Sequence, residues 1–214
     1  DILSLCIKNT EHLITIGCKI IIIACNTATT NAIAYLRNKY QIPFIGIEPA
    51  IKPAALMSKT NSIGILATRG TLSSQLFHET SKALALEINI TEVVGEGLVS
   101  LIENGDMASP QTITLLKKYL EPMLAANIDY LVLGCSHYPY LIQQLEKLLP
   151  NNIQIIDSGL AVAKQTKLIL GSKNLLNTSL SKPKLEFYIN SNTTTLKFLL
   201  EHYQESIIIS EKSF

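Results

Sequence analysis

The chain has 214 residues, of which 47% are hydrophobic and 16% are charged, and its formal net charge is +1. These values are typical of a soluble globular protein with one large domain or two small ones. They argue against two classes of protein: no cluster of Lys and Arg offers a nucleic-acid surface, and the longest apolar run, at about Ile20–Ala24, is too short to cross a membrane.

Short apolar runs alternate with helical patterns along the chain. The runs predict strands at Lys19–Ala24, Pro43–Ile47, Ser62–Leu66, Ile88–Val94, Tyr130–Leu133, Ile153–Ile156, Leu185–Ile189 and Ser206–Ile209. Helices are predicted at Ser109–Ala126, which opens with a Ser-Pro pair, and at Tyr140–Leu149, where leucines recur with the helical period of about 3.6 residues. Gly46–Ala54 and Gly171–Lys184 are interpreted as linkers. Strands that are apolar on both sides and alternate with helices indicate an α/β fold with mostly parallel sheets.

The four cysteines stand at positions 6, 18, 25 and 135, without a Cys-x-x-Cys pair. Zinc and thioredoxin-like sites are therefore disfavoured, and free thiols in a reducing cytosol are expected. Cys25 and Cys135 share a context, because each follows an apolar run and a small residue and precedes polar groups, in "IIIIACNT" and "YLVLGCSH". Ligands of open parallel sheets bind beyond the carboxyl ends of strands, and a helix N-terminus favours an anion. Both thiols are therefore predicted to lie at a ligand site with a lowered pKa.

Two similar thiols suit proton transfer on opposite faces of one carbon. One thiolate would remove an α-hydrogen and the other thiol would return a proton, which inverts the stereocentre; donors at helix N-termini would stabilise the developing charge. The polar neighbours also have simpler interpretations: Asn26-Thr27 as a helix cap, His137 as a structural histidine and Asp157-Ser158 as a helix N-cap. Cys6, Cys18, the other histidines (12, 78 and 202), Glu48 and Glu96 are interpreted as buried-apolar or surface residues.

The motifs "ACNTAT" and "LGCSHYP" resemble the two catalytic-cysteine motifs of the cofactor-independent glutamate racemases. The segments "PFIGIEPAIKPA", "IGILATRGTLSSQLF" and "IIDSGLAVA" are also similar to that family, so the resemblance covers about Lys19–Ala163. It implies that Cys25 and Cys135 are the proton-transfer residues. It implies a glutamate-binding site made by Asn26, Thr27, Ser136, His137, Thr68 and Thr71. It further implies a cytoplasmic enzyme that supplies D-glutamate for peptidoglycan and cell shape, needs no metal or other cofactor, and has a homodimer as a candidate assembly.

The family fold consists of two pseudo-symmetric α/β domains with the active site in the cleft between them. Here the first domain would comprise residues 1–48 plus 159–214, and the second would comprise residues 49–158. Ser136 replaces a usual Thr, and Gly95 replaces one carboxylate of a common Glu-Glu-Gly run.

The family's opening Asp-Ser-Gly-x-Gly-Gly segment and a later Tyr-Gly pair are missing before Cys25, where only 24 residues stand and a strand–helix–strand unit needs ~30. We therefore expect a racemase sequence truncated at its N-terminus, with impaired activity and an unpaired sheet edge.

Three alternatives are open at the level of sequence. The first is a racemase for another amino acid such as aspartate. The second is a thiol redox protein, which would need Cys25 and Cys135 at disulfide distance, about 4.4–6.8 Å between Cα atoms. The third is a non-catalytic ligand-binding remnant of the fold.

Overall fold

The computed structural model describes residues 1–84, 87–201 and 207–212. Every strand pair among these residues is parallel, and the strands form three sheets, ordered β1-β2, β4-β3-β5-β6 and β7-β8. Helices alternate with the strands along the chain. The predicted α/β class with parallel sheets is therefore confirmed.

The elements have the following bounds. The strands are β1 (Ile21–Ile23), β2 (Phe44–Gly46), β3 (Ser62–Ala67), β4 (Asn89–Val94), β5 (Tyr130–Gly134), β6 (Gln154–Ile156), β7 (Leu185–Ile189) and β8 (Ile207–Glu211). The helices are α1 (Ile2–Thr15), α2 (Asn26–Lys39), α3 (Ile51–Met57), α4 (Arg69–Leu72), α5 (Gln75–Leu84), α6 (Leu98–Glu103), α7 (Pro110–Ala125), the 3₁₀ helix η1 (Tyr138–Leu141), α8 (Ile142–Leu148), α9 (Gly159–Ser172) and α10 (Thr194–Leu199).

The four-stranded sheet has an apolar core on each face. Leu66 of β3 and Leu131 of β5 belong to a cluster with residues of α6, α7 and α8, whereas Ile65 of β3 and Val132 of β5 belong to a second cluster with residues of α3 and α5. Every residue of β3 is buried as a result. Because successive side chains of a strand point to opposite faces, burial on both faces explains why this strand reads as a continuous apolar run.

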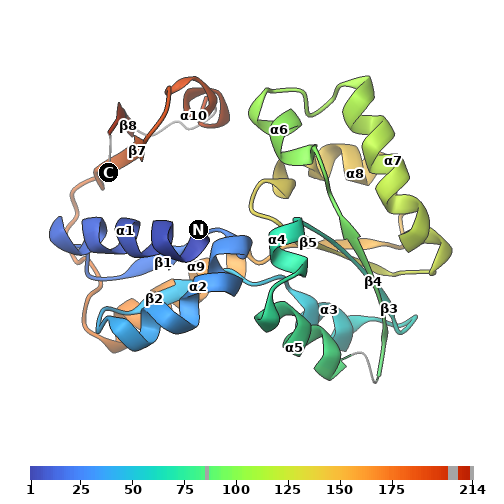
Figure 1. Cartoon of the computed structure of the whole chain (residues 1–214), viewed down its shortest axis with the longest axis horizontal. Coiled ribbons are helices and arrows are strands. Elements are labelled where there is room, and N and C mark those ends of the chain that lie inside the picture. Colours follow the sequence, from blue (N-terminus) through green and yellow to red (C-terminus); the bar gives the residue numbers. More distant parts are fainter. Residues whose placement is uncertain (85–86, 202–206, 213–214) are drawn as a thin grey trace.

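The two-stranded sheet of β1 and β2 lies in a separate part of the molecule (Figure 1). Helices α1 and α2 pack together beside it, and α9 contacts β2. Ile21 of β1 pairs with Phe44 of β2, and both contribute to a small third core. Among the described residues β1 has β2 as its one strand partner, and Ile22 in its middle is 42% exposed.

The last described segment forms a small unit of β7, α10 and β8 (Figure 1). It reaches the four-stranded part through α10. The Phe198 ring lies 3.2–3.5 Å from the position that a Cβ would take at Gly105, on the connection between α6 and α7, and Leu199 packs against the apolar cluster of α6, α7 and α8. Gly105 has a φ of +83°, which favours glycine.

Local boundaries differ from the predictions in a few places. The predicted linker Gly46–Ala54 is partly wrong, because α3 begins at Ile51, and Ile51 and Ala54 are buried against the sheet. Pro53 is tolerated there since the first helical turn has no partner for its N–H groups. The predicted helix Tyr140–Leu149 is preceded by a 3₁₀ turn that starts two residues earlier. Ser206, predicted to open the last strand, lies outside the described residues.

The predicted helix Ser109–Ala126 is confirmed as α7. Pro110 occupies its first turn, and the Ser109 hydroxyl accepts a hydrogen bond from the Thr112 amide at 3.2 Å. This side-chain cap satisfies one of the amides that a helix N-terminus leaves unpaired.

Candidate active site

Cys25 stands between the end of β1 and the start of α2. It is the N-cap residue of the helix, in extended conformation, and its exposed side chain makes no capping hydrogen bond. The next residue, Asn26, is only 2% exposed, and its Nδ2 atom is buried without a hydrogen-bond partner in the part of the chain that the structure describes. A buried amide donor beside an uncapped helix N-terminus is a favourable place for a carboxylate.

Three threonine hydroxyls meet beside Cys25. The Oγ1 atom of Thr27 shares hydrogen bonds with those of Thr68 at 2.7 Å and Thr71 at 3.1 Å, and Thr68 and Thr71 are 3.1 Å apart. Thr27 belongs to α2, whereas Thr68 is the N-cap of α4 and Thr71 lies within α4, some 40 residues further along the chain. A Cβ at Gly70 would lie 2.6 Å from the Thr27 methyl group, so a glycine permits this approach. The fold thus brings together three of the predicted site residues.

Cys135 follows the last residue of β5 and is 8% exposed. Burial raises the pKa of its thiol, the backbone amides of His137 and Tyr138 lower that pKa, and the charge of Cys25 raises it; the net direction is upward. The prediction of a lowered pKa is therefore wrong for Cys135, because burial outweighs the amides and a short 3₁₀ turn follows in place of an α-helix.

The His137 ring joins Cys135 to a carboxylate that the sequence did not suggest. Its Nδ1 atom lies 3.9 Å from the Cys135 sulfur, and its Nε2 atom lies 3.1 Å from Oε1 of Glu103, the last residue of α6. The interpretation of His137 as a histidine bonded through its ring to backbone is therefore wrong. Ser136, between them, is half-buried.

The family model of the Asp/Glu/Hydantoin racemases matches residues 4–166. The chain belongs to this family. The match begins before Lys19, where the resemblance of the motifs starts, and it includes both cysteines.

Similar proteins agree with this racemase assignment. A glutamate racemase from Ectopseudomonas mendocina is 44% identical over 174 residues, which make up 81% of this chain and 66% of that protein. A crystal structure of the Escherichia coli glutamate racemase with L-glutamate and the activator UDP-MurNAc-Ala has a TM-score of 0.83 and 29% identity, covering 99% of this chain and 81% of that one. The Francisella tularensis glutamate racemase with D-glutamate has a TM-score of 0.83 and 26% identity, covering 99% and 80%. The chain spans less than two thirds of the length of the first curated relatives.

Asp157, Ser158 and Glu96 each have a partner in the structure. Asp157 accepts a hydrogen bond from the Gly159 amide at 2.6 Å, while the Ser158 hydroxyl donates to the Glu48 carbonyl. The predicted cap of α9 is thus made by the aspartate, and the serine ties together two segments distant in sequence. Glu96 is exposed, as predicted, and pairs with Arg69 at 2.6 Å.

Cys6 and Cys18 are half-buried, so they are less buried than predicted. His12 is also half-buried, so it is less exposed than predicted. His78 and Glu48 are exposed as predicted, and His202 lies outside the described residues.

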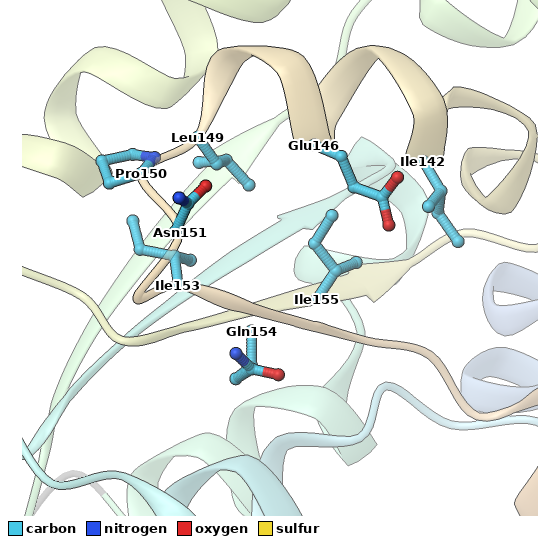
Figure 2. A pocket seen from close by; sticks show the side chains of 8 residues that line it. All are labelled: Ile142, Glu146, Leu149, Pro150, Asn151, Ile153, Gln154 and Ile155. Atoms are coloured by element: carbon cyan, nitrogen blue, oxygen red, sulfur yellow. The ribbon is translucent and has the colours of Figure 1, made fainter.

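A cavity of about 640 Å³ lies between α8 and β6, as Figure 2 shows. Its lining residues are Ile142, Glu146, Leu149, Pro150, Asn151, Ile153, Gln154 and Ile155. No predicted site residue lines this cavity, so it is separate from the residues of the candidate site.

Over residues 1–84, 87–201 and 207–212, no group of three His, Cys, Asp or Glu side chains is arranged to hold a metal ion. No helix in these ranges is long and apolar enough to span a bilayer.

Proposed function

We propose that this chain carries the catalytic groups of a glutamate racemase, which interconverts L- and D-glutamate through two cysteines and without a cofactor. The observation that carries this proposal is the placement of Cys25 and Cys135, which stand just beyond the carboxyl ends of β1 and β5, strands of two different sheets. The similarity to racemases whose structures hold L-glutamate or D-glutamate supports the choice of substrate.

The proposed reaction moves one proton off the α-carbon and another onto its opposite face. A cysteine thiolate removes the α-hydrogen, so the C–H bond breaks and an S–H bond forms, and the opposite thiol then protonates the carbanion. The reaction therefore needs one thiolate and one thiol at a time. Burial and the charge of Cys25 both raise the pKa of Cys135, which favours the thiol form of Cys135, the form that donates a proton.

The substrate is held, in this proposal, by neutral donors rather than by fixed cations. The Asn26 amide, which has no hydrogen-bond partner among the described residues, and the N-terminus of α2 would receive a carboxylate. The hydroxyls of Thr27, Thr68 and Thr71 would exchange their mutual hydrogen bonds for bonds to the substrate. Ser136 and His137 would contribute from the other side. Such donors can stabilise the charge that develops when the weakly acidic α-hydrogen leaves.

His137 and Glu103 form a relay to the second thiol. A histidine whose one nitrogen faces a sulfur and whose other nitrogen faces a carboxylate resembles the arrangement by which a nucleophile's base is oriented by a third group. Glu103 would hold the ring, through the 3.1 Å contact to Nε2, with Nδ1 directed at Cys135. We propose that this pair sets the protonation of Cys135 between turnovers.

We also propose the division into two domains, residues 1–48 plus 159–214 and residues 49–158, with the site in the cleft between them. The contacts of α2 with α4 and α5 and the bond of Ser158 to the Glu48 carbonyl support it, because they join the two groups of elements at their boundary. A cytoplasmic role in supplying D-glutamate for peptidoglycan belongs to the same proposal. The homodimer stays a prediction.

The test is racemisation of enantiopure glutamate, followed by circular dichroism, together with deuterium uptake at the α-carbon in D₂O. The unmodified chain should racemise both enantiomers. Cys25→Ser and Cys135→Ser should each lower the rate by about 100-fold or more, the usual scale for loss of an acid–base group. Cys18→Ser is the matched control and should leave the rate unchanged.

Each alternative has its own signature in these experiments. A folded protein that leaves the optical signal of glutamate constant while racemising aspartate would support the aspartate alternative. All four cysteines are free, so a 25–135 disulfide after mild oxidation, without racemisation, would support the redox alternative. Glutamate binding without deuterium uptake would support the non-catalytic one.

A further inference from the structure

Tyr138, which follows His137, is completely buried. Its hydroxyl donates a hydrogen bond to the Gly95 carbonyl at 3.0 Å. Gly95 follows the last residue of β4, and a Cβ there would lie 2.3 Å from the Tyr138 oxygen. The glycine that departs from the racemase family's carboxylate-containing run therefore lies directly against this phenol.

A second tyrosine holds the neighbouring carbonyl of the same connection. The Tyr119 hydroxyl, on α7, donates to the Glu96 carbonyl at 2.8 Å. Tyr119 is 9% exposed, so both phenols are largely buried. The two bonds are chemically alike, but Tyr119 lies outside the turn that contains Cys135.

The turn from Cys135 to Tyr138 presents its backbone amides to the Cys135 thiol. The Tyr138 amide donates to the Cys135 carbonyl at 3.1 Å, and the amides of His137 and Tyr138 both lower the pKa of the Cys135 sulfur. Because the turn is a short 3₁₀ helix, its geometry depends on what anchors Tyr138.

We propose that the Tyr138 phenol is a positioning group for Cys135: its bond to the Gly95 carbonyl fixes the turn whose amides face the sulfur. This role deepens the proposed racemase function and rests on it. The titratable groups around the sulfur are Cys25 at the N-cap of α2, His137 on the same turn, and Glu103, which acts through His137 from α6. The Tyr138 phenol is a fourth, and burial and the charge of Cys135 raise its pKa. Tyr138→Phe leaves the first three side chains in the sequence.

The test is the pH dependence of thiol alkylation by iodoacetamide, measured for each cysteine peptide by mass spectrometry on the whole chain without substrate. Tyr138→Phe should raise the pH midpoint of Cys135 alkylation by about one unit, as expected when hydrogen bonds to a thiolate weaken. The midpoint of Cys18 should stay constant and serves as an internal reference. Tyr119→Phe, which removes the neighbouring phenol, should leave the Cys135 midpoint unchanged.

Two outcomes would overturn the proposal: an unchanged Cys135 midpoint in folded Tyr138→Phe, or an equal shift in Tyr119→Phe. If Tyr138→Phe does not fold, Gly95→Ala replaces it, because the added methyl displaces the phenol from the carbonyl; it must shift the midpoint in the same direction. The alkylation readout does not need racemisation. A chain that lacks racemase activity therefore leaves this test intact, and failure of the two proposals can be told apart.

Discussion

The side chains around the two thiols divide into those that the motifs contain and those that the fold adds. Cys25, Asn26 and Thr27 are consecutive, and Cys135 to His137 are consecutive as well. Glu103 reaches His137 from a different helix, 34 residues earlier in the chain. At the scale of single residues, Glu103 is therefore the residue outside the two motifs whose substitution best tests the proposed site.

Glu103→Gln should lower the racemisation rate about tenfold, equivalent to ~1.4 kcal/mol in activation free energy. The amide keeps the size of the side chain but removes the carboxylate charge that orients the His137 ring. The effect should appear in kcat, with KM for glutamate little changed, in steady-state measurements from both enantiomers.

Glu96→Gln is the control for this charge change. It removes the same charge from a glutamate that pairs with the exposed Arg69 and not with His137. Equal losses of kcat in both variants would contradict the role given to Glu103.

How far a sequence predicts such a site depends on whether the signal is local. The repeated order of strand, small residue, cysteine and polar residue is local, so both thiols and their neighbours could be predicted. The contact between Glu103 and His137 depends on how α6 packs against η1, which no single segment encodes. The pKa of Cys135 was predicted in the wrong direction because its burial comes from tertiary packing.

At the scale of secondary-structure elements, Asp129 anchors the turn between α3 and β3. Its carboxylate accepts hydrogen bonds from the Ser58 hydroxyl at 2.6 Å and from the amides of Lys59 and Thr60 at 2.5 and 3.1 Å. Burial alone would raise the pKa of this carboxyl group, but the hydrogen bonds outweigh it and lower the pKa. The charged form is therefore the one that the fold stabilises.

Asp129→Asn should lower the free energy of unfolding at neutral pH by about 1–3 kcal/mol, since buried donors lose a charged acceptor. Because the folded pKa lies below that of an unfolded aspartate, about 3.9, this stabilisation is present above that pH and is lost as the pH falls through the folded pKa. Urea unfolding at several pH values should therefore show a shallower acid dependence for the variant.

Asp106→Asn is the matched control, because Asp106 is exposed. It should change neither the stability nor its acid dependence. An Asp129→Asn protein with unaltered acid dependence would disprove the assignment of this effect to Asp129.

Element boundaries show the same dependence on locality. The helix α7 could be predicted because its start signal, the pair of N-cap Ser109 and first-turn Pro110, is local. The start of α3 was assigned to a linker because Pro49 and Pro53 suggest irregular backbone, whereas burial of Ile51 and Ala54 against the sheet favours a helix.

At the scale of the whole molecule, the proposed reaction assigns both proton transfers to cysteine side chains of the chain itself. If that proposal holds, dialysis against EDTA should leave the racemisation rate and the thermal unfolding temperature unchanged. A rate that falls after dialysis and returns on addition of a divalent cation would contradict this expectation.

The polypeptide passes from the β1–β2 part to the four-stranded part near Glu48 and returns near Ser158, and a hydrogen bond joins these two crossings. In the two-domain arrangement proposed above, a rotation about this point would move the two cysteines apart while every strand pair stayed intact. Either enantiomer could then leave by the same small movement, and the chain would not have to unfold locally to release it.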